Sequence, residues 1–134
     1  MSGRWFEDFK VGDQIVSPGK TITEAEIIDW AFRFDPQPFH MDKEAAAEHM
    51  YGGLIASGWM LGTYSFRLFM LANPWEAAAS LGSPGVDEVR WVRPAHPGIP
   101  CAWRSPLPIP VPPLVSRTGE SLAWDGAYWI KMMI

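Results

Sequence analysis

The chain has 134 residues, 48% of them apolar and eight of them tryptophan, with a formal net charge of −4. This length and apolar content predict one folded domain with a real core, helped by oligomerisation, and exclude a disordered chain. The acidic balance argues against a nucleic-acid-binding protein, because such a protein needs a basic face. Cys101 is the single cysteine, which excludes an internal disulfide and a cysteine-based zinc site.

The sequence predicts neither a targeting segment nor a membrane span. Residues 1–5 contain no apolar signal-peptide run. The longest apolar stretch, 54–71, is broken by serine, glycine, threonine and arginine residues. We therefore expect a cytoplasmic protein without a membrane partner.

A strand and a helix are predicted in the first part of the chain. Segment 6–22 has the pattern of a leading loop and a strand, interrupted by the turn residues Ser17-Pro18-Gly19. Thr23 and Glu26 have the spacing of a capping box, which marks the start of a helix. The helix should end before Asp35, because a residue that precedes a proline disfavours the helical conformation.

Residues 35–40, Asp-Pro-Gln-Pro-Phe-His, place a carboxylate and an imidazole five positions apart. The two prolines keep Asp35 and Gln37 extended, so we expect a stiff, non-helical linker. A carboxylate and a histidine that face one small target, such as a water molecule, suit general acid–base catalysis. The alternative is a proline-rich turn with a surface Asp35 and an incidental His40.

The glycine-rich segment 52–58 precedes a long apolar helix, predicted over 59–72 and ended by Asn73-Pro74. Because this helix is apolar on nearly every side, we expect it to be buried and wrapped by a sheet. Glycine lets backbone N–H groups approach a ligand, and the helix dipole favours negative charge there, as an oxyanion hole requires. Tight packing of the glycines against a sheet is the alternative.

Shorter elements are predicted on either side of the long helix. A helix is expected over 43–50, with Asp42 as its N-cap and His49 as a partly exposed helix residue. A strand is expected over 86–92, and His96 follows in a proline-containing loop. The three histidines of the chain lack the spacing of metal ligands, so we predict no metal site and no cofactor.

These elements, in this order, resemble the MaoC-like dehydratases, also called (R)-specific enoyl-CoA hydratases. The resemblance covers residues 5–98 and rests on Asp-Pro-Gln-Pro-Phe-His-Met-Asp at 35–42, three alanines at 45–47 and Gly-Gly-Leu-Ile-Ala-Ser-Gly at 52–58. Gln37 stands where the family usually has asparagine, and both are amides. The resemblance implies an α+β hot-dog fold, an antiparallel sheet wrapped around a long central helix, and a homodimer.

The resemblance also implies a reaction, the addition of water to an enoyl thioester such as an acyl-CoA, or its removal. Asp35 and His40 would hold and activate the water, and the backbone N–H of Gly58 would bind the thioester carbonyl. The further candidates for the substrate-binding site are Gln37, Ser57 and Thr63. For the serine and the threonine, the alternative is a helix cap or a core hydroxyl that is already hydrogen-bonded.

After residue 98 the sequence departs from the family, so we divide the chain into a hot-dog portion, 1–98, and an atypical proline-rich tail, 99–134. The prolines disfavour central strands, and a strand-like pattern returns only at 127–132. Translation from the third base of codon 98 permits Asp-Thr-Leu-Arg-Val-Glu, which the family shows at this point. Our hypothesis is a single-base deletion near codon 98. The alternative is a genuine arm that packs on a partner subunit.

Two other classes of function stay open at the level of sequence. A non-catalytic hot-dog domain would bind acyl groups without chemistry, although it has no need of an acid–histidine pair. A truncated hydratase without activity is the other, because a sheet that lacks strands after residue 98 would leave apolar helix surface uncovered.

Overall fold

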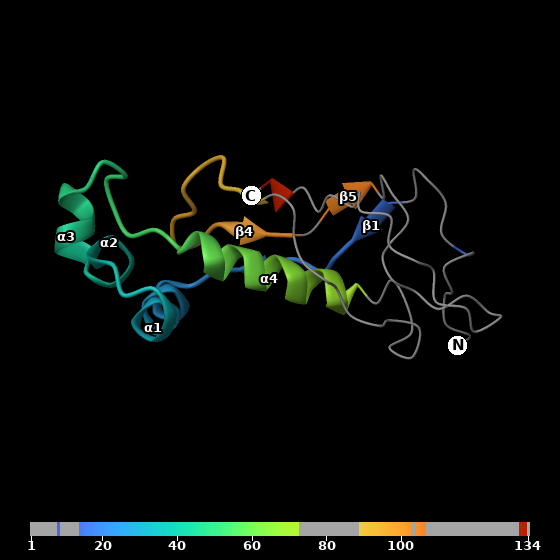
Figure 1. The fold of residues 1–134 in the computed structure, drawn as a ribbon, viewed down its shortest axis with the longest axis horizontal. Coiled ribbons are helices and arrows are strands. Elements are labelled where there is room, and N and C mark those ends of the chain that lie inside the picture. Colours follow the sequence, from blue (N-terminus) through green and yellow to red (C-terminus); the bar gives the residue numbers. More distant parts are fainter. Residues whose placement is uncertain (1–7, 9–13, 73–88, 103, 107–131, 134) are drawn as a thin grey trace.

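The computed structural model describes residues 8, 14–72, 89–102, 104–106 and 132–133 (Figure 1). The long helix α4 (Gly58–Leu71) lies along the strands, and three shorter helices gather at its N-terminal end (Figure 1). The other elements, in chain order, are β1 (Gln14–Val16), β2 (Lys20–Thr21), α1 (Glu24–Phe34), α2 (Pro38–Met41), α3 (Lys43–Glu48), β3 (Val89–Arg90), β4 (Pro100–Cys101), β5 (Arg104–Pro106) and β6 (Met132–Met133).

The described strands form three pairs. β1 pairs with β5 and β2 pairs with β4, both antiparallel, and β3 pairs with β6 in parallel. β4 and β5 lie in the tail at positions where the sequence pattern predicted no strand, and they contain Pro100 and Pro106. Pro100 is the first residue of β4, a position at which a strand tolerates proline. Residues 86–88 of the strand predicted over 86–92, and residues 103, 107–131 and 134 of the tail, lie outside the described residues.

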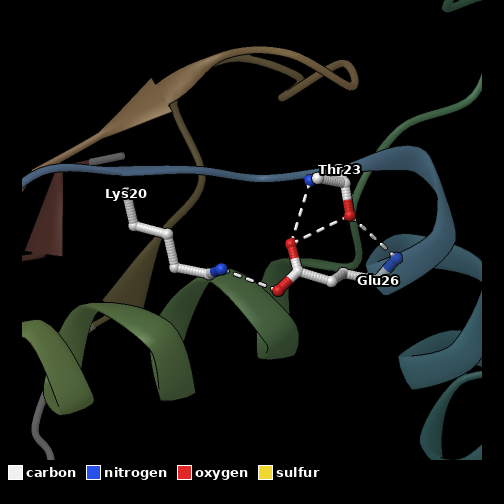
Figure 2. A network of polar contacts seen from close by, with 3 residues as sticks. All are labelled: Lys20, Thr23 and Glu26. Carbon is white, nitrogen blue, oxygen red and sulfur yellow. Dashed lines mark hydrogen bonds and ion pairs between the residues drawn. The ribbon is translucent and has the colours of Figure 1, made fainter.

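Helix α1 begins at the predicted capping box. The Thr23 hydroxyl accepts from the Glu26 N–H at 3.3 Å, and the Thr23 N–H donates to the Glu26 carboxylate at 3.0 Å. The other Glu26 oxygen lies 2.6 Å from the Lys20 ammonium, as Figure 2 shows. One carboxylate therefore joins the first residue of β2 to the start of α1. The helix ends at Phe34, immediately before Asp35, as predicted.

Helix α2 corrects the prediction of a wholly non-helical linker between Asp35 and His40. Gln37 is extended as predicted, but Pro38 begins a helical turn that carries His40. Proline suits the first position of a helix, because the N–H that it lacks would have no acceptor within the helix. The turn packs against α1 and α3 and buries the His40 side chain.

Helix α3 has the predicted cap but ends early. The Asp42 carboxylate accepts from the N–H groups of Glu44 and Ala45, as an N-cap does. The helix stops at Glu48, so His49 is its C-cap and not the helix residue that was predicted. The His49 ring stacks on Phe39 with 4.5 Å between ring centroids.

Helix α4 is buried on one side only, which corrects the prediction of burial all round. Met60, Leu61 and Leu68 are buried, whereas Trp59 is 65% exposed and Phe66 55% exposed. Apolar composition shows that a helix avoids water, but it does not show whether its own chain supplies the cover. None of the described helices is long and apolar enough to cross a membrane.

The core lies at the N-terminal end of α4. Ile22, Ile27 and Met60 are fully buried and bring together the end of β2, helix α1 and the first turn of α4. Full burial of a side chain of this size stabilises the fold by about 1.5–3 kcal/mol. The best-packed region therefore surrounds the point where α1, α2 and α4 meet, which is also where Asp35, His40 and Gly58 lie.

Candidate active site

Asp35 and His40 come together at the junction of α1 and α2. The Asp35 carboxylate oxygen Oδ2 lies 3.5 Å from His40 Nε2, and the His40 side chain is 5% exposed against 19% for Asp35. This separation is too long for a strong direct hydrogen bond. It suits two groups that share a small polar molecule such as water.

The second ring nitrogen of His40 determines the tautomer. His40 Nδ1 lies 2.7 Å from the backbone carbonyl oxygen of Ile55. A carbonyl only accepts, so Nδ1 carries a proton. In the neutral ring, Nε2 then presents a lone pair on the side of Asp35. The buried backbone of Ile55 thus leaves His40 as a base directed toward the carboxylate.

Both oxygens of the Asp35 carboxylate are held. The Gln37 amide donates to Oδ1 at 2.7 Å, and the Ser57 hydroxyl donates to Oδ2 at 2.6 Å. Partial burial raises the pKa of Asp35, but the bonds from Ser57 and Gln37 and the nearby His40 outweigh that effect, so the pKa lies below its usual value. Asp35 is therefore ionised at neutral pH and accepts hydrogen bonds.

Gly58 is the first residue of α4, so its backbone N–H lies at the N-terminal end of the helix. The first N–H groups of an α-helix have no acceptor within the helix. Ser57 Oγ takes the N–H of Trp59 at 3.2 Å, and no acceptor for the Gly58 N–H occurs among the described residues. The dipole of α4 adds positive potential at this position. An anionic oxygen at this point is favoured.

Trp91 packs directly on Gly58. A β-carbon at position 58 would lie 2.4 Å from Trp91 Cε2, whereas one at Gly62 would lie 3.4 Å from Trp91 Cη2. Trp91 is 42% exposed and meets Trp59 edge to face at 6.0 Å between ring centroids. Glycine at position 58 therefore allows the indole to approach the helix backbone, which agrees with the packing alternative for this glycine.

The loop after β3 holds the segment that leads into α4. The Ala56 N–H donates to the Ala95 carbonyl at 2.8 Å, and His96 Nδ1 lies 3.0 Å from the Leu54 carbonyl oxygen. The sequence pattern predicts His96 only as a loop residue. The contact joins residues 42 positions apart, and no local pattern indicates such a pairing. His96 therefore supports the site from outside it.

The remaining candidate, Thr63, is not joined to the acid–histidine pair by any described contact. Its hydroxyl donates to the Met60 carbonyl at 2.9 Å, so its hydrogen bond is made within helix α4. This is the alternative stated for such residues, a hydroxyl satisfied by its own helix. His49 contacts Phe39, which lies edge-on to His40 with 4.5 Å between centroids. Among the described residues, no group of three or more histidine, cysteine or carboxylate side chains is placed to hold a metal ion.

The fold and the site define a class of protein, an α+β hot-dog domain with an acid–histidine pair beside a glycine-led central helix. Residues 8–99 match the family model described as the MaoC like domain, and the chain belongs to this family. The predicted family and fold class are thereby confirmed.

Individual relatives agree with this assignment. The protein MaoC of Klebsiella aerogenes is 33% identical over 96 residues, which are 71% of this chain but only 28% of that protein. The structure of a MaoC-like dehydratase from Rhodospirillum rubrum superposes with a TM-score of 0.68 at 37% identity, over 75% of this chain and 67% of that one.

The (R)-hydratase PhaJ1 of Pseudomonas aeruginosa shares the fold at a TM-score of 0.64 and 19% identity, over 88% of this chain and 79% of that one. At this identity, the likeness concerns the fold alone. Of these two proteins of known structure, the one from Rhodospirillum rubrum is named a dehydratase and the one from Pseudomonas aeruginosa a hydratase.

Proposed function

We propose that this protein is an enoyl-thioester hydratase, or in reverse a 3-hydroxyacyl-thioester dehydratase, with Asp35 and His40 as its acid–base pair. The observation that carries the proposal is the geometry of His40. Its Nδ1 proton is fixed on the Ile55 carbonyl, and its Nε2 lone pair lies 3.5 Å from an ionised carboxylate oxygen. A non-catalytic acyl-binding domain has no use for a base held in this way.

The chemistry follows from these positions. A water molecule between His40 Nε2 and Asp35 Oδ2 donates one hydrogen to each. The lone pair of the water oxygen then points away from these two side chains. The oxygen adds to Cβ of the enoyl thioester while Nε2 takes a proton. The charge that develops on the thioester oxygen lies against the Gly58 N–H. The proton on Nε2 then passes to Cα, so the atoms of one water are added and His40 returns to its neutral form.

The substrate class in this proposal is an acyl-CoA thioester, and the protein acts as a cytoplasmic homodimer. Exposed apolar side chains on α4 support the dimer, since Phe66 is 55% exposed and Leu71 55% exposed. Exposed apolar surface of this kind is typical of a protein–protein contact. Gln37 belongs to the site through its bond to Asp35.

The direct test is hydration of crotonyl-CoA, followed by the loss of the conjugated thioester absorbance. We expect turnover by the purified protein and the 3-hydroxybutyryl thioester as the product. An Asp35→Asn variant of equal solubility serves as the control. A soluble, folded wild-type protein that leaves crotonyl-CoA and longer enoyl-CoA substrates unchanged would refute the proposal.

We also propose that the tail 99–134 arises from a shifted reading frame at codon 98. The family match ends at residue 99, where the sequence departs from the family pattern. We expect the coding DNA, read from the third base of codon 98, to spell Asp-Thr-Leu, and the restored chain to be more soluble and to melt at a higher temperature. Nucleotides that do not spell these residues would contradict this proposal and leave the tail as a genuine arm.

A further inference from the structure

Ser57 contacts both halves of the candidate site, the Asp35 carboxylate and the start of α4. It is the last residue before α4 and is 1% exposed, so its hydroxyl is closed off from bulk water. Ser57 Oγ lies 2.6 Å from Asp35 Oδ2 and 3.2 Å from the backbone nitrogen of Trp59. The same oxygen therefore meets the carboxylate on one side and the helix start on the other.

The direction of these two bonds is fixed by their partners. A backbone N–H only donates, so Ser57 Oγ accepts from Trp59, and an ionised carboxylate only accepts, so the hydroxyl proton points to Asp35. The bonds run in series from the positive end of α4 to the carboxylate, and each polarises the next. The hydroxyl has a single proton, which it donates to Asp35.

The oxygen that Ser57 holds is the one that faces the base. Oδ2 is also the atom 3.5 Å from His40 Nε2, while Gln37 holds Oδ1. The Ser57 carbonyl also accepts from the Leu61 N–H at 3.0 Å, so the residue is anchored in the first turn of α4. Because Gly58 is the next residue, a movement of Ser57 moves the Gly58 N–H as well.

We propose that Ser57 is a positioning residue that fixes the position of the Asp35–His40 pair relative to the oxyanion-binding start of α4. This inference rests on the proposed hydratase function and assigns Ser57 a role other than contact with substrate. Loss of its hydroxyl should let the carboxylate rotate and the helix start shift. Small misplacements of this kind impair the chemical step more than they impair binding.

The kinetic test compares Ser57→Ala and Ser57→Gly with the wild-type protein on crotonyl-CoA. We expect kcat to fall about tenfold to a hundredfold in both variants, with KM changed by less than about twofold. Glycine is nearly as good an N-cap as serine, whereas alanine is poor, so Ser57→Gly retains most of the helix stability that Ser57→Ala loses. Equal kinetic losses in the two variants therefore separate positioning from capping.

A matched control is the other serine or threonine N-cap of the described helices, Thr23. It lies at the far end of α1, about 18 Å along the helix from Asp35. Thr23→Ala should lower the melting temperature as Ser57→Ala does and leave kcat unchanged.

A second measurement does not depend on activity. Carboxyl ¹³C resonances of aspartate-labelled protein are titrated, and that of Asp35 is assigned by its absence in Asp35→Asn. The hydrogen bond from Ser57 lowers the pKa of Asp35, so this pKa should rise in both Ser57 variants and stay constant in Thr23→Ala.

The outcomes distinguish the two proposals. A wild-type protein without hydratase activity would refute the proposed function, and the titration would then decide the role of Ser57 by itself. An Asp35 pKa that is the same in both Ser57 variants as in the wild-type protein would overturn the inference. A large rise in KM with kcat unchanged would also overturn it, since that result indicates a substrate contact.

Discussion

Replacing His40 by asparagine should lower kcat for enoyl-CoA hydration by about 10²–10⁴-fold, the range typical of losing a general base. An asparagine amide can donate to the Ile55 carbonyl as His40 Nδ1 does, at an observed 2.7 Å, so the fold is retained. What the variant lacks is the Nε2 lone pair that faces Asp35. The measurement is kcat on crotonyl-CoA, with near-ultraviolet circular dichroism and the melting temperature as checks of folding.

Asp35→Asn, in which the carboxylate loses its charge but keeps its shape, should cause a loss of similar size. Groups that act as a unit are not additive, so the double variant should lose little more than either single one. Multiplicative losses in the double variant would show that the two side chains act independently. Activity retained in a folded His40→Asn protein would remove His40 from the mechanism.

Replacing Gly58 by alanine should destabilise the protein by about 1–3 kcal/mol and reduce activity, because the added methyl group overpacks the site. The new β-carbon would lie 2.4 Å from Trp91 Cε2, so either the indole or the start of α4 must move. Movement of the helix start displaces the Gly58 N–H, and loss of one oxyanion donor costs about 10²–10³ in kcat. The measurements are chemical denaturation and turnover of crotonyl-CoA.

Gly62→Ala is the matched control for this prediction. It lies one turn further along the same helix, where the β-carbon would be 3.4 Å from Trp91 and at the edge of ordinary contact. Alanine in a helix interior is favoured over glycine by about 1 kcal/mol, so this variant should be neutral or stabilised. The Gly58→Ala change should also become nearly neutral for stability when Trp91 is replaced by alanine. An equal loss with and without Trp91 would show that the indole is not the cause.

The local elements of this protein could be predicted because their causes lie within a few residues. The Thr23–Glu26 capping box starts α1, the proline after Asp35 ends it, and Asp42 caps α3. Where a local rule was applied too broadly, the prediction was wrong. The prolines at 36 and 38 predict a non-helical linker, yet Pro38 opens the turn that carries His40, because proline is compatible with the first helical position.

The sequence by itself determined the chemistry available, namely a carboxylate, an imidazole and a glycine-led helix in an order that identifies the family. Only the tertiary structure decided how these groups face one another. The Ile55 carbonyl sets the tautomer of His40, and Ser57 sets which oxygen of Asp35 meets it. These partners lie 15 and 22 positions away along the chain, and residue spacing carries no record of such contacts. Periodicity and capping act locally, whereas the orientation of a buried polar group depends on whichever distant atom satisfies it.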